Sequence, residues 1–201
     1  MSLPHPSPPF AATRLSRLGH AGFTAIELLV VISIAAILVA LALPSFNGVI
    51  ARYQIQRATE EMISTIYQAR SEAIKRGGQV MMVKTATGVG CSAPTAQEWS
   101  CGWTLFFDAN SNGTFDTGAG SSDIMLRSSG APKAVNVGTT LAAGFTTRTF
   151  DRWGRSNGLG IFGFHFDSLA LPSTVPNKMI CMSSGGRLRT LTDAGNTCPN
   201  P

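Results

Sequence analysis

The chain has 201 residues and a formal net charge of +5, a length that accommodates one domain of modest size together with a targeting element. We find no internal repeat and no second domain. A zinc site is disfavoured because the sequence has no Cys-x-x-Cys pair and His165 is the only histidine after residue 22. No nucleophile motif and no pair of carboxylates stands out, so we predict neither an enzyme nor a bound cofactor or metal.

Residues 1–22 are predicted to form a leader that is later removed. They contain four prolines, Arg14 and Arg17, and no acidic residue. An ordinary secretory signal is cut after its apolar stretch, whereas here the small residue Gly22 precedes the apolar run 23–43, so the run would survive processing. At ~1.5 Å per residue this run forms about 31 Å of helix, which matches the hydrocarbon core of a bilayer. The two arginines then keep the leader in the cytosol and the rest of the chain is exported.

Glu27 places a single carboxylate near the start of this apolar run. An unpaired carboxylate inside a membrane costs roughly 2.5–3.5 kcal/mol, so we expect it to have a partner. Our hypothesis is the free amine of a neighbouring subunit, created when the chain is cut between Gly22 and Phe23. An ordinary single-pass anchor would leave Glu27 unexplained.

Residues 44–77 are predicted to continue the helix as an amphipathic half that packs on a domain. Apolar residues recur at spacings of three and four, the periodicity of one helix face: Ile55, Ala58, Met62, Ile66, Ala69 and Ala73. Pro44 removes one backbone donor, so we expect a kink or local melting there. Lys75 and Arg76 suit the negative end of the helix dipole, and the pair 77–78 of glycines ends the helix.

Residues 78–201 are predicted to form a β-rich globular domain, because short β-like runs alternate with Gly, Ser, Asn and Asp. The expected strands are 79–84, 103–108, 123–128, 144–151, 161–167, 178–183 and 187–191. The fold class is therefore α+β: a long N-terminal helix, transmembrane in its first half, packed on antiparallel sheets.

Four cysteines lie outside the membrane in this topology: Cys91, Cys101, Cys181 and Cys198. An even number in an oxidising compartment favours disulfides, and the sequence allows three pairings. We favour the two local pairs, 91 with 101 and 181 with 198, because each closes a short loop in a region without regular structure.

The N-terminal residues resemble the type IV pilin signature: Gly22 before the cut, Phe23 first in the mature chain, Glu27 fifth, and Pro44 at position 22 of the mature chain. This resemblance implies cleavage by the prepilin peptidase and N-methylation of Phe23. It also implies that Glu27 helps to recruit or register the subunit. The expected location is the inner membrane, with the globular domain in the periplasm. The expected partners are the lipid bilayer, an inner-membrane assembly platform and other pilin or pseudopilin subunits.

The mature chain is similar to the FimT/GspH group of minor pilins and pseudopilins over most of its length. The marks of this group are a Gly-Trp strand entering an Asp/Asn-rich turn, the segments 124–127 and 150–155, and the segment 180–183 before Gly186-Arg187-Leu188-Arg189. Two interpretations compete within it. One is a FimT-like subunit that serves pilus assembly and DNA uptake, which we favour, and the other is a minor pseudopilin of a type II secretion system. A third hypothesis is a membrane-tethered DNA-binding module, which would not need Glu27.

Basic residues concentrate in the C-terminal half, where residues 126–201 hold eight basic and three acidic side chains. Arg187 and Arg189 would share one face of a strand, and FimT-like proteins are thought to bind DNA through such a Gly-Arg-x-Arg element. We expect further contacts to double-stranded DNA from Arg148, Arg152, Arg155 and Lys178. Without an aromatic ladder, binding should be led by the phosphate backbone and sensitive to salt. A solvated surface with salt bridges is the alternative.

Residues 108–113 copy the first half of a calcium-binding loop. The twelfth position is Ala119, where a bidentate Glu is needed, so the match fails, although Asp116 and Asp123 are possible substitutes. A hairpin turn explains the Asn-Gly pair at 112–113 more simply.

Overall fold

The computed structural model describes residues 22–88, 91–92, 95–118, 120–140, 145–156, 162–172, 175–183, 185–192 and 197–198. Within them lie the helix α1 (Ala25–Arg76) and ten strands: β1 (Val80–Lys84), β2 (Thr87–Gly88), β3 (Cys91–Ser92), β4 (Trp103–Phe107), β5 (Ile124–Ser129), β6 (Val135–Thr139), β7 (Thr147–Phe150), β8 (Phe162–Ser168), β9 (Lys178–Met182) and β10 (Leu188–Thr192). The chain forms two compact units, residues 1–42 and 43–201, and each is described by itself.

In the second unit, the apolar face of α1 is buried against the sheets. The six positions whose spacing predicted this face, from Ile55 to Ala73, are all at most 3% exposed. The helix ends as predicted at Arg76, because Gly77 adopts a left-handed conformation with φ of 82°. The amide of Gly78 then donates to the carbonyl of Ala73 at 2.7 Å, which satisfies one of the free carbonyls of the last turn.

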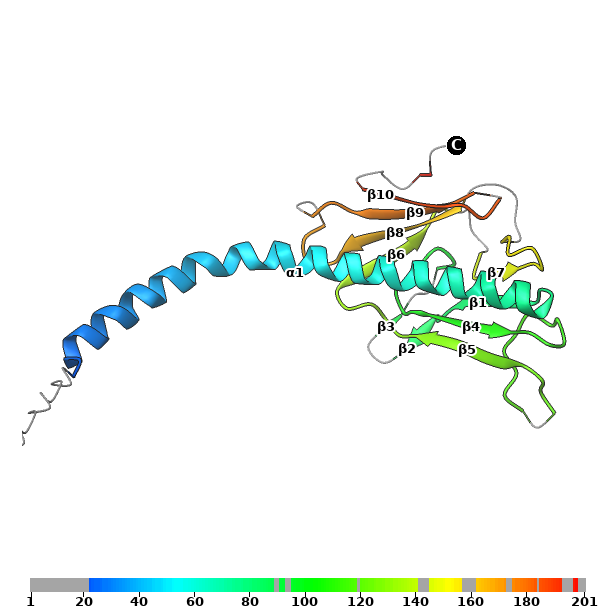
Figure 1. Ribbon diagram of the computed structural model, residues 1–201, viewed down its shortest axis with the longest axis horizontal. Helices are drawn as coiled ribbons and strands as arrows, with labels where there is room; N and C mark the ends of the chain where they lie inside the picture. Colours follow the sequence, from blue (N-terminus) through cyan, green and yellow to red (C-terminus); the bar gives the residue numbers. More distant parts are fainter. Residues whose placement is uncertain are drawn as a thin grey trace, which may run out of the picture. The chain divides into compact units, whose positions relative to one another are not determined.

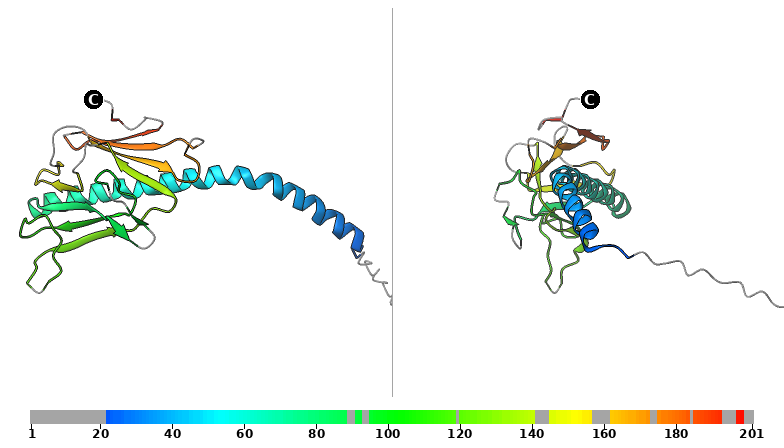
Figure 2. Two further views of the ribbon diagram at one scale, coloured as in Figure 1. Left: turned by 180° about the vertical axis from the view of Figure 1, so that it is seen from behind. Right: turned by 90° about the vertical axis from the view of Figure 1, so that its left-hand side faces the viewer.

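Two four-stranded sheets lie along this part of α1, one with the strand order β5-β4-β1-β7 and the other with the order β10-β9-β8-β6. Every strand pairing in both sheets is antiparallel. Figure 1 shows β4 and β5 of the first sheet below the helix and the second sheet above it, and Figure 2 shows the same arrangement from behind and end-on. The fold is α+β, which confirms the predicted fold class.

The core of this unit lies where the helix meets both sheets. Its largest fully buried side chains include Trp99, Trp103, Phe106, Phe150, Phe164 and Phe166. Trp99 lies edge-on to Phe164, with ring centroids 5.1 Å apart, and its amide donates to the carbonyl of Val137 at 2.7 Å. The segment before β4 is thereby packed against the second sheet.

All seven predicted strands are present, and each observed strand lies within its predicted range or extends one residue beyond it. The fourth, β7, is shorter than predicted and begins at Thr147. The starts predicted at 144 and 161 lie outside the described residues. The strands β2, β3 and β6 were not predicted. β6 contains Gly138, and a glycine in sequence is more typical of a turn than of a strand. The structure explains this glycine, because a Cβ atom at position 138 would lie 2.3 Å from the His165 ring.

Two disulfides join Cys91 to Cys101 and Cys181 to Cys198, which are the two local pairs favoured from the sequence. The first ties β3 to the turn before β4. The second fixes a C-terminal residue against β8 and β9, where a Cβ atom on Gly163 would lie 2.4 Å from the sulfur of Cys198.

Candidate functional site

Glu27 lies in the first turn of α1 and has a partner within its own helix. Its Oε2 atom accepts hydrogen bonds from the amide and the hydroxyl of Thr24, both at 2.9 Å, and the Glu27 amide donates to the Thr24 hydroxyl at 3.3 Å. This is a capping box, which satisfies free amides at a helix start. This partner within the helix was not predicted from the sequence. Within the described residues, Oε1 accepts no hydrogen bond.

The large apolar side chains from Phe23 to Leu41 are all exposed, by 49–87%. Among the described residues, no single helix is both long and apolar enough to span a membrane; the segments Ala25–Leu41 and Phe46–Arg76 meet that test only together, as a bent pair. The leader and its arginines lie outside the described residues, apart from Gly22. Pro44 lies within α1, and its side chain is not among those described.

A tight turn at 151–155 presents two of the predicted functional side chains, Arg152 and Arg155. The Oδ1 atom of Asp151 accepts the amides of Trp153 and Arg155 at 2.9 and 2.8 Å, and its Oδ2 accepts from Nε and Nη2 of Arg155 at 3.0 Å. Burial opposes ionisation of Asp151, but these amides and the guanidinium outweigh it and lower the pKa of the carboxyl. Arg152, Trp153 and Arg155 are exposed.

A second turn joins β9 to β10 and carries Arg187. The amide of Ser183 donates to the carbonyl of Arg187 at 3.0 Å, and the amide of Gly186 donates to the carbonyl of Ser183 at 2.8 Å. Arg187 stands just before β10, one residue earlier than the strand start, and Arg189 lies within β10, an edge strand. Both arginines are exposed.

Arg70 of α1 holds these two turns together. Its Nε donates to the carbonyl of Gly154 at 2.8 Å, and its Nη1 donates to the carbonyl of Gly186 at 2.5 Å. One guanidinium therefore joins segments 84 and 116 residues away in the chain. Arg70 thus connects the turn that carries Arg152 and Arg155 with the turn that carries Arg187, which is followed by Arg189 in β10. These four exposed arginines, Arg152, Arg155, Arg187 and Arg189, are called the arginine cluster below.

Two residues of the predicted basic patch do not belong to this cluster. Arg148 is 3% exposed and lies between the rings of Phe145 and Phe162, with its Cζ atom 4.6 and 4.4 Å from their centroids. Burial lowers the pKa of its guanidinium to about 10. A guanidinium in this position cannot contact DNA at the surface, so the prediction for Arg148 was wrong. It lies on the same face of β7 as Phe150, a period-two pattern that the sequence contains.

Lys178 lies at the opposite end of the β9–β10 hairpin from Arg187. It pairs in register with Thr192, whereas Met182 pairs with Leu188 near the turn. Its ammonium group donates to the side-chain oxygen of Gln56 on α1. At ~3.3 Å per residue, this places Lys178 about 13 Å along the strand from the turn. The structure therefore does not bring it to the arginine cluster.

The loop at 108–123 joins β4 to β5 and is longer than the hairpin turn expected from its Asn-Gly pair. Asp108 accepts the amides of Asn112 and Gly113 at 3.3 and 2.8 Å, and Asp123 accepts the amides of Ala109 and Asp116 at 2.9 and 3.0 Å. These carboxylates thus hold the main chain of the loop. Ala119, at the twelfth position of the calcium pattern, lies outside the described residues.

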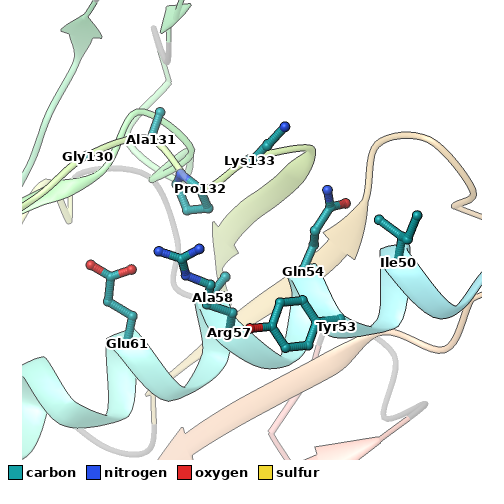
Figure 3. Close-up of a pocket in the computed structure, with 10 residues that line it drawn as sticks. All are labelled: Ile50, Tyr53, Gln54, Arg57, Ala58, Glu61, Gly130, Ala131, Pro132 and Lys133. Carbon is teal, nitrogen blue, oxygen red and sulfur yellow. The ribbon is translucent and has the colours of Figure 1, made fainter. Parts of the chain in front are cut away.

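A pocket of about 430 Å³ lies between α1 and the loop at 130–133 (Figure 3). Its apolar wall includes Ile50 and Tyr53, which are 51% and 66% exposed, and Pro132 lies opposite. Arg57 and Lys133 place charge on the same pocket. Tyr53 also lines a second pocket, of about 560 Å³, on the side of β9 and β10.

The sequence profile of the family described as "Type II transport protein GspH" matches residues 58–186. This match spans more than half of the chain. The chain belongs to this family, which comprises minor pilins of type IV systems and minor pseudopilins of type II secretion. The matched part of this GspH-family chain contains Arg70, the turn at 151–155 and Gly186.

Similar proteins agree with this assignment. A fimbrial protein of Pseudomonas aeruginosa is 39% identical over 64 residues, which cover 32% of this chain and 41% of that protein. The pilin-like protein PilA1 of Thermus thermophilus is 32% identical over 97 residues, which cover 48% of this chain and 54% of that protein. The chain thus spans about half or less of these relatives. The crystal structure of the minor pilin FimU of Pseudomonas aeruginosa is 17% identical in sequence to this chain. It aligns with 73% of this chain and 94% of the FimU chain with a TM-score of 0.52, which shows a shared fold.

Sequence reasoning missed three features of these sites. The capping box could have been predicted from the sequence, because Thr24 and Glu27 have the spacing of the Thr-x-x-Glu pattern before an apolar run. Trp153 was visible only as part of a family mark. Arg70 gave no signal, since an arginine on the polar side of an amphipathic helix ordinarily faces solvent.

Proposed function

We propose that this chain is a minor subunit of a type IV filament, inserted in the inner membrane, cut after Gly22 by the prepilin peptidase and assembled by an inner-membrane platform. The observation that carries this proposal is the N-terminal helix, whose apolar side chains are exposed from Phe23 to Leu41. Contiguous apolar surface of this extent requires lipid or protein to cover it. For a filament subunit, lipid covers this surface while the subunit is in the membrane, and neighbouring subunits cover it in the filament. The role is structural and not catalytic.

Glu27 has the geometry to act in assembly. Its Oε2 is engaged by Thr24, which fixes the carboxylate at the helix start, while Oε1 accepts no hydrogen bond within the described residues. The amine of Phe23 on a neighbouring subunit would pair with it, and the attraction strengthens as the local dielectric falls. Two pockets that share Tyr53 offer a second contact surface further along the helix.

Within the filament class, we favour a FimT-like role in pilus assembly and DNA uptake. The support is the arginine cluster: its four side chains are exposed, and Arg70 joins the two turns that carry three of them. The carboxylate of Asp151 in the first turn is already paired with Arg155. The planar set of N–H donors on a guanidinium matches the spacing of the oxygens of a phosphate group. The second candidate is a minor pseudopilin of the type II secretion system, which the description of the matching family favours. Deleting the gene separates the two: loss of transformation supports the first, and loss of protein secretion supports the second.

The assembly role is tested with two substitutions at Glu27. Glutamine can still cap the helix but cannot pair with an amine as an anion, so E27Q isolates the charge, and E27A removes both functions. We expect both variants to be cut normally and to fail to enter filaments, measured by blotting sheared filaments and membranes. T24V is the matched control, because it weakens the cap and keeps the charge. Normal incorporation of E27Q would contradict the pairing with Phe23.

DNA contact is tested with the full chain purified in detergent. The double variant R187A/R189A should weaken binding to a duplex by a similar factor for unrelated sequences. The slope of log K against log salt should fall by about 1.8, since each lost phosphate contact contributes about 0.9. K178A is the matched control, because this lysine lies at the far end of the same hairpin. Unchanged affinity of R187A/R189A would rule out the DNA-binding role.

A further inference from the structure

Trp153 is the exposed tryptophan of this chain. It is 69% exposed at the outer corner of the turn at 151–155, whereas Trp99 and Trp103 are fully buried. These three residues are all the tryptophans in the sequence. A single exposed apolar residue is ordinary on a protein surface, so its meaning depends on how it is held and on what surrounds it.

The turn holds Trp153 in a fixed position without covering its ring. Its amide donates to Asp151 at 2.9 Å, and the amide of the following Gly154 donates to the Asp151 carbonyl at 2.8 Å. Gly154 has φ of 69° and lies against Ile74 and Arg70, so a side chain there would be strained and crowded. The indole is therefore presented on a backbone that is already ordered, which lowers the entropy lost when a ligand binds.

The surroundings of Trp153 are cationic. Arg152 precedes it in the chain and Arg155 follows two residues later. Arg70, through its bonds to Gly154 and Gly186, brings the second turn and Arg187 to the same end of the helix. An aromatic face among guanidiniums fits a ligand that has both flat π-surfaces and regularly spaced negative charges.

We propose that Trp153 is a stacking platform for an unpaired base, so that the arginine cluster and Trp153 together bind single-stranded DNA more tightly than a duplex. This inference rests on the proposed DNA contact and goes beyond it, because arginine–phosphate pairs alone do not distinguish the two forms. The bases of a duplex are stacked on one another and offer no face to the indole. An unpaired strand offers one at every nucleotide, and stacking on an aromatic side chain is tolerant of sequence.

The affinity test uses the full chain in detergent, a 20-nucleotide oligothymidylate and a 20-base-pair duplex at one salt concentration. W153A should weaken oligothymidylate binding by about 5- to 150-fold and duplex binding by less than about twofold. W153F keeps an aromatic face and should retain most of the affinity. Y53A is the matched control: Tyr53 is a similarly exposed aromatic, 66% against 69%, and lies 17 residues before Arg70 on α1, about 25 Å along the helix.

Intrinsic fluorescence gives an independent readout, because only Trp153 among the three tryptophans is accessible. Binding of oligothymidylate should quench part of the Trp153 emission. It should also protect the remaining Trp153 emission from quenching by acrylamide. In W153F both effects should be absent, while the emission of the buried Trp99 and Trp103 stays unchanged. That unchanged emission also shows that the variant is folded.

The possible outcomes separate the stacking inference from the proposed DNA-binding role. If W153A binds oligothymidylate as the wild type does, while R187A/R189A loses it, the stacking inference is wrong and the DNA contact stands. If the wild-type chain binds neither DNA, both the DNA-binding role and this inference fail. If W153A leaves DNA binding intact but reduces cross-linking to other filament subunits, Trp153 is a protein contact and the inference is overturned.

Discussion

The indole N–H of Trp103, on β4, donates a hydrogen bond to the hydroxyl of Thr65, on α1, at 3.1 Å. Both residues are fully buried. The same hydroxyl donates to the carbonyl of Glu61 at 2.8 Å, so Thr65 joins the helix to the first sheet with both of its hydrogen-bonding functions used. This contact fixes the rotation of the helix on the sheet, and with it the side of α1 that carries Arg70.

The substitution T65V should lower the free energy of unfolding by about 1–3 kcal/mol, because it leaves the indole N–H of Trp103 buried without an acceptor. T65S keeps the hydroxyl and should cost less. T59V is the control, since the buried Thr59 hydroxyl bonds only to the carbonyl of Ile55 in its own helix among the described residues. Chemical denaturation of the three variants measures the difference. A T65V variant no less stable than T59V would show that the contact does not stabilise the fold.

The substitution R70M should release both turns of the candidate site from α1. We expect it to lower the free energy of unfolding by about 1.5–3 kcal/mol, the range for hydrogen bonds made by a charged group. Amides at 151–156 and 183–188 should exchange faster with solvent while those of β1 and β4 stay protected. R70K keeps the charge but lacks the separated N–H groups of the guanidinium, so its exchange rates should lie between those of R70M and the wild type. Equal exchange in R70M and the wild type would contradict the role of Arg70 as a link between the turns.

Removal of the disulfide between Cys181 and Cys198 should destabilise the second unit. The bond closes a loop with a separation of 17 residues, which corresponds to about 3 kcal/mol of chain entropy in the unfolded state. The bond between Cys91 and Cys101, with a separation of 10, should contribute slightly less, about 2.7 kcal/mol. Thermal unfolding of the two double alanine variants tests this. Unfolding temperatures that do not change in either variant would count against it.

His165 should make stability depend on pH. Burial lowers the pKa of its imidazole below the usual 6.5, and the nearby Asp167, 3.7 Å away, opposes this only in part. The unfolded chain therefore takes up the proton at a higher pH than the folded chain does. Stability should fall as the pH drops through about 6.5 and level off below the folded pKa. Denaturation of the wild type and of H165N between pH 5 and 8 checks the assignment: the slope in this window should shrink in H165N.

Much of the fold could be predicted because its signals are local. The buried face of α1 follows from the spacing of Ile55, Met62 and Ile66, and the end of the helix follows from Gly77, whose left-handed conformation few other residues adopt. Strand β6 escaped prediction because Gly138 interrupts its pattern. The reason for that glycine is the ring of His165 on the neighbouring strand, which no local pattern contains.

The candidate site was only partly predictable, because charge identifies a residue but not its surroundings. Arg148 and Arg187 are equal in charge, yet one is enclosed by two phenyl rings and the other stands on a turn. Lys178 was assigned to the same patch as a basic residue of the C-terminal half, and the antiparallel register places it at the far end of the hairpin from Arg187.

By itself, the sequence determined the elements of this protein: the apolar start with Glu27, the amphipathic helix, most strands and two short disulfide loops. Each depends on residues that are close in the chain, where spacing alone dictates geometry. Only the tertiary structure decided which charges stand together. A helix arginine reaches carbonyls 84 and 116 residues away because two sheets fold against one helix face, and these contacts join the turn that carries Trp153 to the turn that carries Arg187.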